Sequence, residues 1–302
     1  MLLLFDDCAF LRSKTSTPLR LSSGVSRPAL TSWERYWRLV HTSDRSIRSP
    51  IDVFVDRLAV RAHGRWLDAG CGRQSLPEWR SEELQRVLAG GVVLFGCDAD
   101  LLALTERRDP GSVCGATLDE LPFRDASFDF VSANMVFEHL VKPQTTVLEL
   151  ARVTRPGGRI LVHTVNGLHY LSWMARLTPY RFHQWIVERV EGRAGKDVYP
   201  TQYRANTVGR LRRLFEDSGC RFVDGGLVDG IPLYLPYRGL FDVAIRVGLL
   251  ERRLAHLPGL SNFLRPNLLM EFERICAETP SGCHNLRGIP YDSADGLDQS
   301  RF

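Results

Sequence analysis

The sequence predicts an α/β protein with a doubly wound, mostly parallel sheet of seven strands and helices on both faces. Two observations support this fold class. Short apolar runs alternate along the chain with stretches of helical periodicity, and runs such as 92–97 are apolar at nearly every position. Strands that alternate with helices form parallel sheets, and strands covered on both faces are apolar throughout.

Local signals place the elements in chain order. Ser49 and Pro50 mark the start of the first well-defined helix, because serine caps helices and proline suits their first turn. Strands are expected at 66–69, 92–97, 112–117, 128–133, 159–165, 221–227 and 267–275. Helices are expected at 33–40, 77–89, 101–107 and 143–153, in a segment capped by Asn206 and closed by Gly219, and at 238–256.

Composition limits the class of protein. The 302 residues are 44% hydrophobic and 25% charged, which excludes a disordered or collagen-like chain. No apolar run reaches about 18 residues, and the apolar start at 1–5 is too short for a secretory signal, so we expect a cytoplasmic protein. We also expect disordered tails at 1–30 and 279–302, on either side of one domain at 31–278.

Charge and cysteine content exclude further classes. The net charge is +4 without a dense basic cluster, so we expect no nucleic-acid partner. Seven cysteines are scattered without a C-x-x-C pair, a pattern typical of reduced thiols rather than disulfides or a zinc site. We therefore expect no metal.

The segment with the clearest chemistry is a glycine turn at the end of one strand, followed by an acidic residue at the end of the next. Gly70 and Gly72 let backbone N–H groups approach a ligand, and Asp98 can hold two ribose hydroxyls. An NAD(P)-dependent oxidoreductase would carry a third glycine where Ser75 stands, and a helix starting sooner than Pro77. That class stays open as an alternative that the incomplete glycine pattern disfavours.

Three segments together resemble one family. They are Leu-Asp-Ala-Gly-Cys-Gly at 67–72, Leu-Pro-Phe-Arg-Asp-Ala-Ser-Phe-Asp at 121–129 and Arg-Val-Thr-Arg-Pro-Gly-Gly at 152–158. Their order and spacing are similar to those of class I S-adenosylmethionine (SAM)-dependent methyltransferases, in the group that includes ubiquinone- and menaquinone-pathway enzymes. The resemblance implies SAM as cofactor and a Rossmann-like class I fold. It also implies a cofactor half at about 50–166, a helical lid insertion after the fifth strand at 167–203, and C-terminal elements at 204–278.

The resemblance also implies which residues bind the cofactor. The turn would lie against the methionine part of SAM, the strand ends against its ribose and adenine, and the end of the fourth strand against its sulfonium. The residues are Asp68, Ala69, Gly70, Cys71, Gly72, Asp98, Ala99, Thr117, Leu118 and Asn134. Two positions depart from the family pattern, since Gln74 stands where a glycine is usual and Thr117 where an aspartate is common.

The sequence indicates the catalytic residues less clearly than the cofactor-binding residues. Methyl transfer needs mainly an acceptor held in line near an already activated methyl group. A general base is required only when the acceptor must lose a proton. Glu138, His139, His169 and Tyr170 are the candidates, at the ends of the fourth and fifth strands. For Glu138 and His139 a structural role at a helix terminus is the alternative.

The predicted function is methyl transfer from SAM to a small-molecule acceptor, which the aromatic-rich insertion at 167–203 suggests is lipophilic. We favour O-methylation over C- or N-methylation. A methyltransferase-like binding protein without turnover is the alternative function. For 238–256, contact with an anionic membrane surface and packing on the sheet as a crossover helix are both open. The oligomeric state is also open.

Overall fold

The computed structural model describes residues 49–77, 80–178, 199–229, 241–257 and 259–275, and for 241–245 the backbone alone. The predictions of tails at 1–30 and 279–302 and of a helix at 33–40 lie outside these residues. None of the helices in the described ranges is both long enough and apolar enough to span a membrane.

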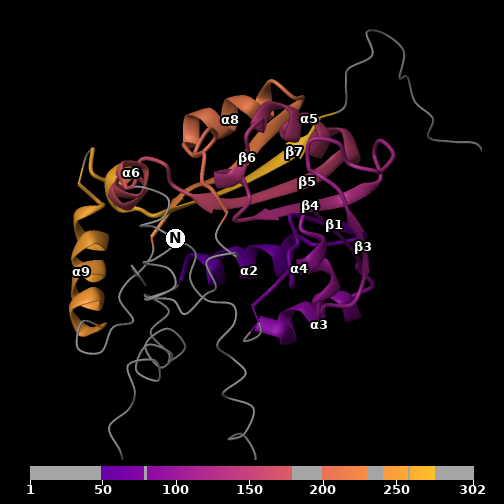
Figure 1. Ribbon diagram of the computed structural model, residues 1–302, viewed down its shortest axis with the longest axis horizontal. Helices are drawn as coiled ribbons and strands as arrows, with labels where there is room; N and C mark the ends of the chain where they lie inside the picture. The colour runs from indigo at the N-terminus through magenta and orange to yellow at the C-terminus, as the bar shows by residue number, and fades with distance from the viewer. Residues whose placement is uncertain (1–48, 78–79, 179–198, 230–240, 258, 276–302) are drawn as a thin grey trace, which may run out of the picture.

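One mixed sheet of seven strands organises the molecule, in the order β3-β2-β1-β4-β5-β7-β6 (Figure 1). The strands are β1 (Arg65–Ala69), β2 (Val93–Asp98), β3 (Ser112–Gly115), β4 (Phe128–Asn134), β5 (Thr154–Val165), β6 (Cys220–Val228) and β7 (Asn267–Arg274). The first five are parallel, and β7 runs antiparallel to both β5 and β6. The predicted seven-stranded, mostly parallel sheet is therefore confirmed.

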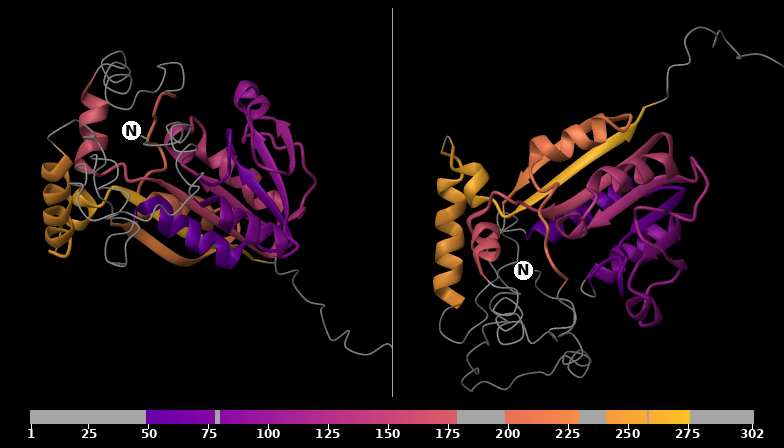
Figure 2. Two further views of the ribbon diagram at one scale, coloured as in Figure 1. Left: turned by 90° about the horizontal axis from the view of Figure 1, so that it is seen from below. Right: turned by 45° about the horizontal axis from the view of Figure 1, so that its top comes forward.

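Helices cover both faces of this sheet (Figures 1 and 2). On one face, α2 (Pro50–Arg61) and α3 (Ser81–Ala89) bury Phe54, Leu58 and Leu84 against β1 and β4. On the other face, α5 (Pro143–Val153) and α8 (Val208–Glu216) pack in the core that includes Leu150 and Phe215. The short helix α4 (Leu101–Thr105) contacts β2 and β3. Such two-sided burial explains the runs of consecutive buried apolar residues in the central strands, such as Ile160, Leu161 and Val162 of β5.

Most predicted boundaries agree with the structure to within two residues: β3, for example, ends at Gly115 rather than at 117, and α4 at Thr105 rather than at 107. Three further differences concern α3, β5 and the cap of α8. Helix α3 begins at Ser81 rather than at 77. Strand β5 extends back to Thr154, so the Pro-Gly-Gly run at 156–158 lies in its irregular first part, where Gly157 has a φ of 77°. Helix α8 is capped by Thr207, whose side chain accepts from the Arg210 N–H.

The prediction of Asn206 as the cap of α8 is wrong because its side chain is used elsewhere. Asn206 is buried, and its amide donates to Thr164 Oγ1 at 2.8 Å and to the Val165 carbonyl at 3.0 Å. These bonds tie the start of α8 to the end of β5. Both asparagine and threonine suit a cap, so the burial beside β5 decided between them.

Three helices lie beyond the carboxyl ends of the parallel strands: α6 (Tyr170–Leu177), α9 (Phe241–Leu254) and α10 (Ser261–Leu264). Helix α9 packs against α10, and the Tyr170 hydroxyl of α6 donates to Glu251 of α9 at 2.6 Å. Figures 1 and 2 show α9 standing away from the sheet, beside α6. The interpretation of 238–256 as a crossover helix packed on the sheet is therefore wrong. Since β6 and β7 are antiparallel neighbours, their connection need not cross a face.

Candidate functional site

A tight glycine turn follows β1 at the carboxyl edge of the sheet. Gly70 and Gly72 have φ angles of 76° and 49°, in the left-handed region that favours glycine. A Cβ on Gly70 would lie 2.3 Å from Val136, whereas one on Gly72 would meet no atom within 4 Å. The Gly70 and Cys71 N–H groups donate to the Cys97 carbonyl at 2.8 and 3.1 Å. The turn is thus fastened to β2 and presents an open side at Gly72.

Asp98 lies at the end of β2 beside this open side. Its Oδ2 accepts from the Gly72 N–H and its Oδ1 from the Asp100 N–H, both at 2.8 Å. A carboxylate offers about four lone-pair sites, so each oxygen keeps room for another donor such as a hydroxyl. A charged acceptor beside an open glycine turn suits a ribose, so the residues present fit a nucleoside cofactor.

Asp68 lies in β1 just before the turn and is buried. Ser132 donates to its Oδ1 at 3.0 Å and in turn accepts from Trp66 Nε1 at 2.8 Å. Burial raises the pKa of Asp68 to about 6, although the nearby Arg107 guanidinium and the Ser75 and Ser132 hydroxyls oppose that rise. Asp68 therefore becomes a carboxylate only near neutral pH.

Arg107 was not predicted from the sequence, and its side chain binds the backbone of the glycine turn. Its side chain is 4% exposed and pairs with Asp109 at 3.5 Å. One terminal nitrogen donates to the carbonyls of Cys71 (3.0 Å) and Gly72 (3.3 Å), and the other to Ser75 Oγ at 2.7 Å. Because these acceptors are mostly backbone carbonyls, no residue pattern in the sequence could have indicated the contact.

Gln74 and Thr117, the two residues that depart from the family pattern, have different surroundings. Gln74 follows the glycine turn, and its side-chain Nε2 is buried without a hydrogen-bond partner in the described part of the chain. Thr117 is exposed, and Leu118 beside it packs in the core. The Gln74 side chain thus offers a hydrogen-bond donor at a position where a glycine would have no side-chain donor.

At the end of β4, Asn134 is oriented by two residues from neighbouring strands. His163 Nδ1 lies 2.7 Å from Asn134 Oδ1, and His163 Nε2 lies 3.2 Å from the Asn267 amide nitrogen. Burial lowers the pKa of His163 to about 3, so its ring is neutral. Since Nε2 accepts from Asn267, Nδ1 carries the proton and donates to Asn134. The Asn134 amide nitrogen, which has no hydrogen-bond partner among the described residues, can donate to a ligand.

Glu138 and His139 form a short 3-10 turn, η3 (Phe137–His139), after β4. Glu138 is 1% exposed; its Oε2 accepts from Thr164 Oγ1 at 2.8 Å, while its Oε1 has no hydrogen-bond partner among residues the structure describes. His139 Nε2 lies 3.9 Å from that oxygen. His139 Nδ1 lies 3.1 Å from the Pro200 carbonyl, which can only accept, so Nδ1 carries a proton.

The last residues of the predicted insertion, 199–203, lie across these strand ends. The N–H groups of Gln202 and Tyr203 donate to the Glu138 carbonyl at 2.6 and 3.1 Å. The Tyr199 hydroxyl donates to the Asp100 carboxylate, two residues after Asp98. This segment therefore connects the Glu138–His139 pair to the end of β2 that carries Asp98.

His169 and Tyr170, in contrast, are engaged beyond the end of β5. His169 caps α6 by accepting from the Leu171 N–H at 3.4 Å, and burial lowers its pKa to about 4. The Tyr170 ring contacts Phe263 at 5.6 Å between centroids, and its hydroxyl bonds to Glu251. The contacts of these two residues are with α6, α9 and the segment near α10 rather than with the glycine turn.

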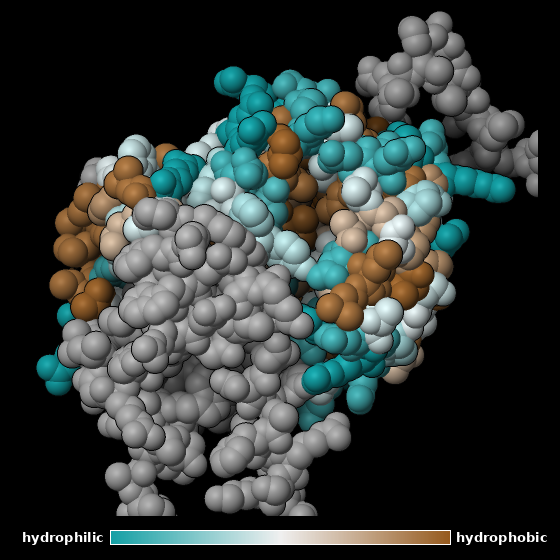
Figure 3. Space-filling model, viewed as in Figure 1, coloured by the Kyte–Doolittle hydropathy of each residue, from teal (hydrophilic) through white to brown (hydrophobic). Residues whose placement is uncertain are grey.

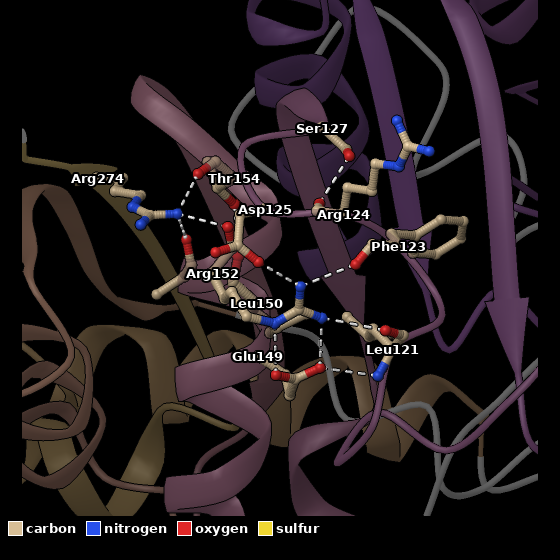
Figure 4. A network of polar contacts seen from close by, with 11 residues as sticks. Leu121, Phe123, Arg124, Asp125, Ser127, Glu149, Leu150, Arg152, Thr154 and Arg274 are labelled. Carbon is tan, nitrogen blue, oxygen red and sulfur yellow. Dashed lines mark hydrogen bonds and ion pairs between the residues drawn. The ribbon is translucent and has the colours of Figure 1, made fainter.

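A second polar network joins two of the recognised sequence segments (Figure 4). Arg152, in the segment 152–158, donates to the carbonyls of Leu121 (3.1 Å) and Phe123 (2.8 Å) in the segment 121–129. It also forms a two-pronged pair with Glu149 at 2.7 and 2.8 Å. Glu149 accepts from the Leu121 N–H, and its pKa is lowered by Arg152. The network holds the chain that follows Thr117 and Leu118.

Comparisons with known proteins match this chain to methyltransferases. Residues 67–162 match the family model described as a methyltransferase domain. A probable SAM-dependent methyltransferase of Mycolicibacterium smegmatis is 35% identical over 139 residues, covering 45% of this chain and 48% of the relative. A demethylmenaquinone methyltransferase of Paenarthrobacter aurescens is 31% identical over 133 residues, covering 42% of this chain and 49% of the relative.

A solved structure shows a similar fold. It is the complex between the Haloferax volcanii Trm112 methyltransferase activator and a methyltransferase, with a TM-score of 0.50 at 19% identity, covering 74% of this chain and 88% of the other. At that identity the likeness shows the fold alone, which is the class I methyltransferase fold. The chain spans about half the length of the curated relatives it matches.

Proposed function

We propose that this chain transfers a methyl group from SAM to a small, lipophilic acceptor, and the match of residues 67–162 to a methyltransferase domain supports the proposal. The observation that carries this proposal is the open glycine turn with Asp98 beside Gly72. The pattern fits a nucleoside, and the absence of a third glycine fits a cofactor without a pyrophosphate.

Each residue then has a distinct task. Asp98 accepts hydrogen bonds from the two ribose hydroxyls with the lone pairs that Gly72 and Asp100 leave free. Leu118 and Thr117 border the adenine together with Ala99. Asp68, Ala69 and the turn from Gly70 through Cys71 to Gly72 border the methionine part, and Asn134 points its amide nitrogen toward the reacting end. When bound, SAM supplies a methyl group already activated by the sulfonium.

The Glu138–His139 pair favours O-methylation. A buried carboxylate oxygen without a hydrogen-bond partner among the described residues lies 3.9 Å from a histidine nitrogen, at the end of β4 beside Asn134. Such a pair can take the proton that a hydroxyl acceptor loses during transfer. His169 and Tyr170 have packing partners on other helices, which makes them weaker candidates.

Calorimetric titration with SAM and S-adenosylhomocysteine tests the proposal. We expect both to bind and to raise the melting temperature, and NAD(H) to do neither, because a ligand of the native state stabilises it. Asp98→Asn should weaken SAM binding by about tenfold to a hundredfold, since hydrogen bonds to a charged acceptor are each worth about 1.5–3 kcal/mol. Glu82→Gln, an exposed acid on α3, is the matched control and should bind normally.

The outcomes separate the alternatives. Binding of NAD(H) without SAM would indicate an oxidoreductase. Normal SAM affinity in Asp98→Asn would mean that the ribose lies elsewhere. SAM binding without methylation of any hydroxyl, ring or amine acceptor would favour a binding protein that keeps the fold without turnover.

A further inference from the structure

Exposed apolar side chains gather on the helices beyond the carboxyl edge of the sheet, on a surface that we call the α6–α9 face. Each is between 37% and 82% exposed. They are Trp173, Met174 and Leu177 of α6, Val247, Leu250 and Leu254 of α9, and Leu257, Leu260 and Phe263. In Figure 3 hydrophobic residues cover α9 at the left edge of the molecule. Contiguous exposed apolar surface of this kind commonly marks an interaction site.

The apolar stripe of α9 is the outer side of that helix. Val247, Leu250 and Leu254 are spaced by three and four residues, so they share one side of the helix. The inner side is marked by Gly248 and Ala255, which are seven residues apart and both buried. With the described part of the chain in place, Val247, Leu250 and Leu254 remain 37–54% exposed, so the stripe presents apolar surface that another surface can cover.

Charge indicates the nature of that surface. Arg246 and Arg253, seven residues apart, are exposed and flank the stripe on one side, with no ion pair to any described residue. Nearby carboxylates are already engaged: Glu251 with Tyr170, and Asp229 with Arg265 at 2.6 Å. An apolar stripe edged by unpaired arginines is typical of helices that lie in the plane of an anionic bilayer surface.

A second copy of this chain fits the same face less well. In a two-fold dimer the same patches meet, so arginines from both copies would approach each other. Among the side chains described on α6 and α9, Glu251 is the one carboxylate, and it already bonds to Tyr170. Anionic lipid phosphates supply the missing charge.

We propose that the α6–α9 face docks on an anionic phospholipid surface. The α9 stripe lies at the boundary of the acyl chains, Arg246 and Arg253 contact phosphates, and Trp173 lies at headgroup level, where tryptophan is enriched. Helix α6 directly follows β5, at the edge that also carries the glycine turn and Asn134 (Figure 1). This step rests on the proposed function: docking through this face brings the methyl-acceptor site close to the bilayer. The acceptor is then a lipophilic molecule that enters from the bilayer.

Co-sedimentation of the full chain with vesicles tests the docking. We expect binding to vesicles of phosphatidylcholine mixed with phosphatidylglycerol, weakening with salt, and little binding to phosphatidylcholine alone. Replacing both Arg246→Gln and Arg253→Gln should weaken binding to the anionic vesicles by about thirtyfold, from the contribution of each arginine near a charged surface. Replacing both Leu250→Gln and Leu254→Gln should abolish it, whereas Leu148→Gln, a leucine 49% exposed on α5, should leave it unchanged.

Two results would overturn the docking proposal. One is failure of the wild-type chain to bind anionic vesicles at low salt. The other is equal binding by the wild-type chain and by the double leucine variant. A change from dimer to monomer in that variant, measured by sedimentation velocity without vesicle binding, would instead assign the face to a second copy. Calorimetry with SAM on each variant keeps the proposals apart, because the α6–α9 face does not contribute to the cofactor residues. Intact SAM binding with failed docking leaves the proposed function standing.

Discussion

Arg107 shows how much of the site depends on one side chain outside the recognised segments. One nitrogen of its buried guanidinium donates hydrogen bonds to the carbonyls of Cys71 and Gly72, and another donates to the Ser75 hydroxyl. It also opposes the rise in the pKa of Asp68. The shape of the glycine turn and the charge of the acid before it therefore depend on the same group.

We expect Arg107→Met to weaken SAM binding by about tenfold and to lower the free energy of unfolding by about 2–4 kcal/mol, since buried acceptors lose a charged donor. Arg107→Lys should recover little, because a lysine ammonium cannot span both sets of acceptors. Calorimetry and urea denaturation measure the two effects. Arg124→Met, at an exposed arginine, is the control. Unchanged SAM affinity in Arg107→Met would show that the turn keeps its shape without the guanidinium.

Single residues were predictable where the chemistry is local. The two glycines and Asp98 could be singled out because glycine turns and strand-end acids have a sequence pattern, and Asp68 followed from the family resemblance. Arg107 could not, since its backbone acceptors lie about 35 residues away and have no residue-type signature. The two partners of His163 were equally hidden, because they lie on β4 and β7.

At the scale of elements, the recognised segments 121–129 and 152–158 prove to be two halves of one contact (Figure 4). Arg152 of α5 donates to the carbonyls of Leu121 and Phe123. Arg274 of β7 donates to the carbonyls of Arg152 at the end of α5 (2.5 Å) and of Thr154 at the start of β5 (2.6 Å). A cation at a helix carboxyl end also interacts favourably with the helix dipole. These segments thus serve the fold, and through it the cofactor side of the sheet.

Arg152→Met should lower the free energy of unfolding by about 2–4 kcal/mol, because the Leu121 and Phe123 carbonyls lose a charged donor and Glu149 loses its partner. Arg152→Lys should cost nearly as much, since lysine cannot reproduce the two-pronged geometry. Urea denaturation at neutral pH measures both. Arg210→Met, at an exposed position on α8, should change stability little. A lysine variant as stable as the wild type would show that charge alone suffices.

The sequence predicted which segments form helices and strands, but it did not always predict which elements pack against one another. The strands and α5 follow from apolar runs and a proline at the first turn, signals that lie within each segment. Periodicity marked α9 as an amphipathic helix without saying which surface its apolar side meets. The antiparallel pairing of β6 with β7 decides that α9 need not cover the sheet, and this pairing involves residues about 45 positions apart.

At the scale of the whole molecule, three buried groups among the described residues, His163, His169 and Asp68, couple stability to pH in the acid range. Burial lowers the pKa of His163 to about 3 and that of His169 to about 4, both below the ordinary value of 6.5. Below pH 6.5 the unfolded chain therefore binds protons that the folded chain does not, and acidification destabilises the fold. Asp68 acts in the opposite direction: its pKa is raised from 3.8 to about 6, so between these values the folded chain binds the extra proton.

Two histidines outweigh one aspartate, so these groups should lower the free energy of unfolding by about 2–3 kcal/mol between pH 7 and pH 5. His163→Gln removes one titrating group while keeping a side chain that can hydrogen-bond to Asn134. The difference between the two pH values should then shrink by about 2 kcal/mol, whatever the variant's absolute stability. His256→Gln, at an exposed histidine, should keep the wild-type difference. Urea denaturation at both pH values measures it, and a wild-type difference in His163→Gln would mean that His163 charges freely in the folded protein.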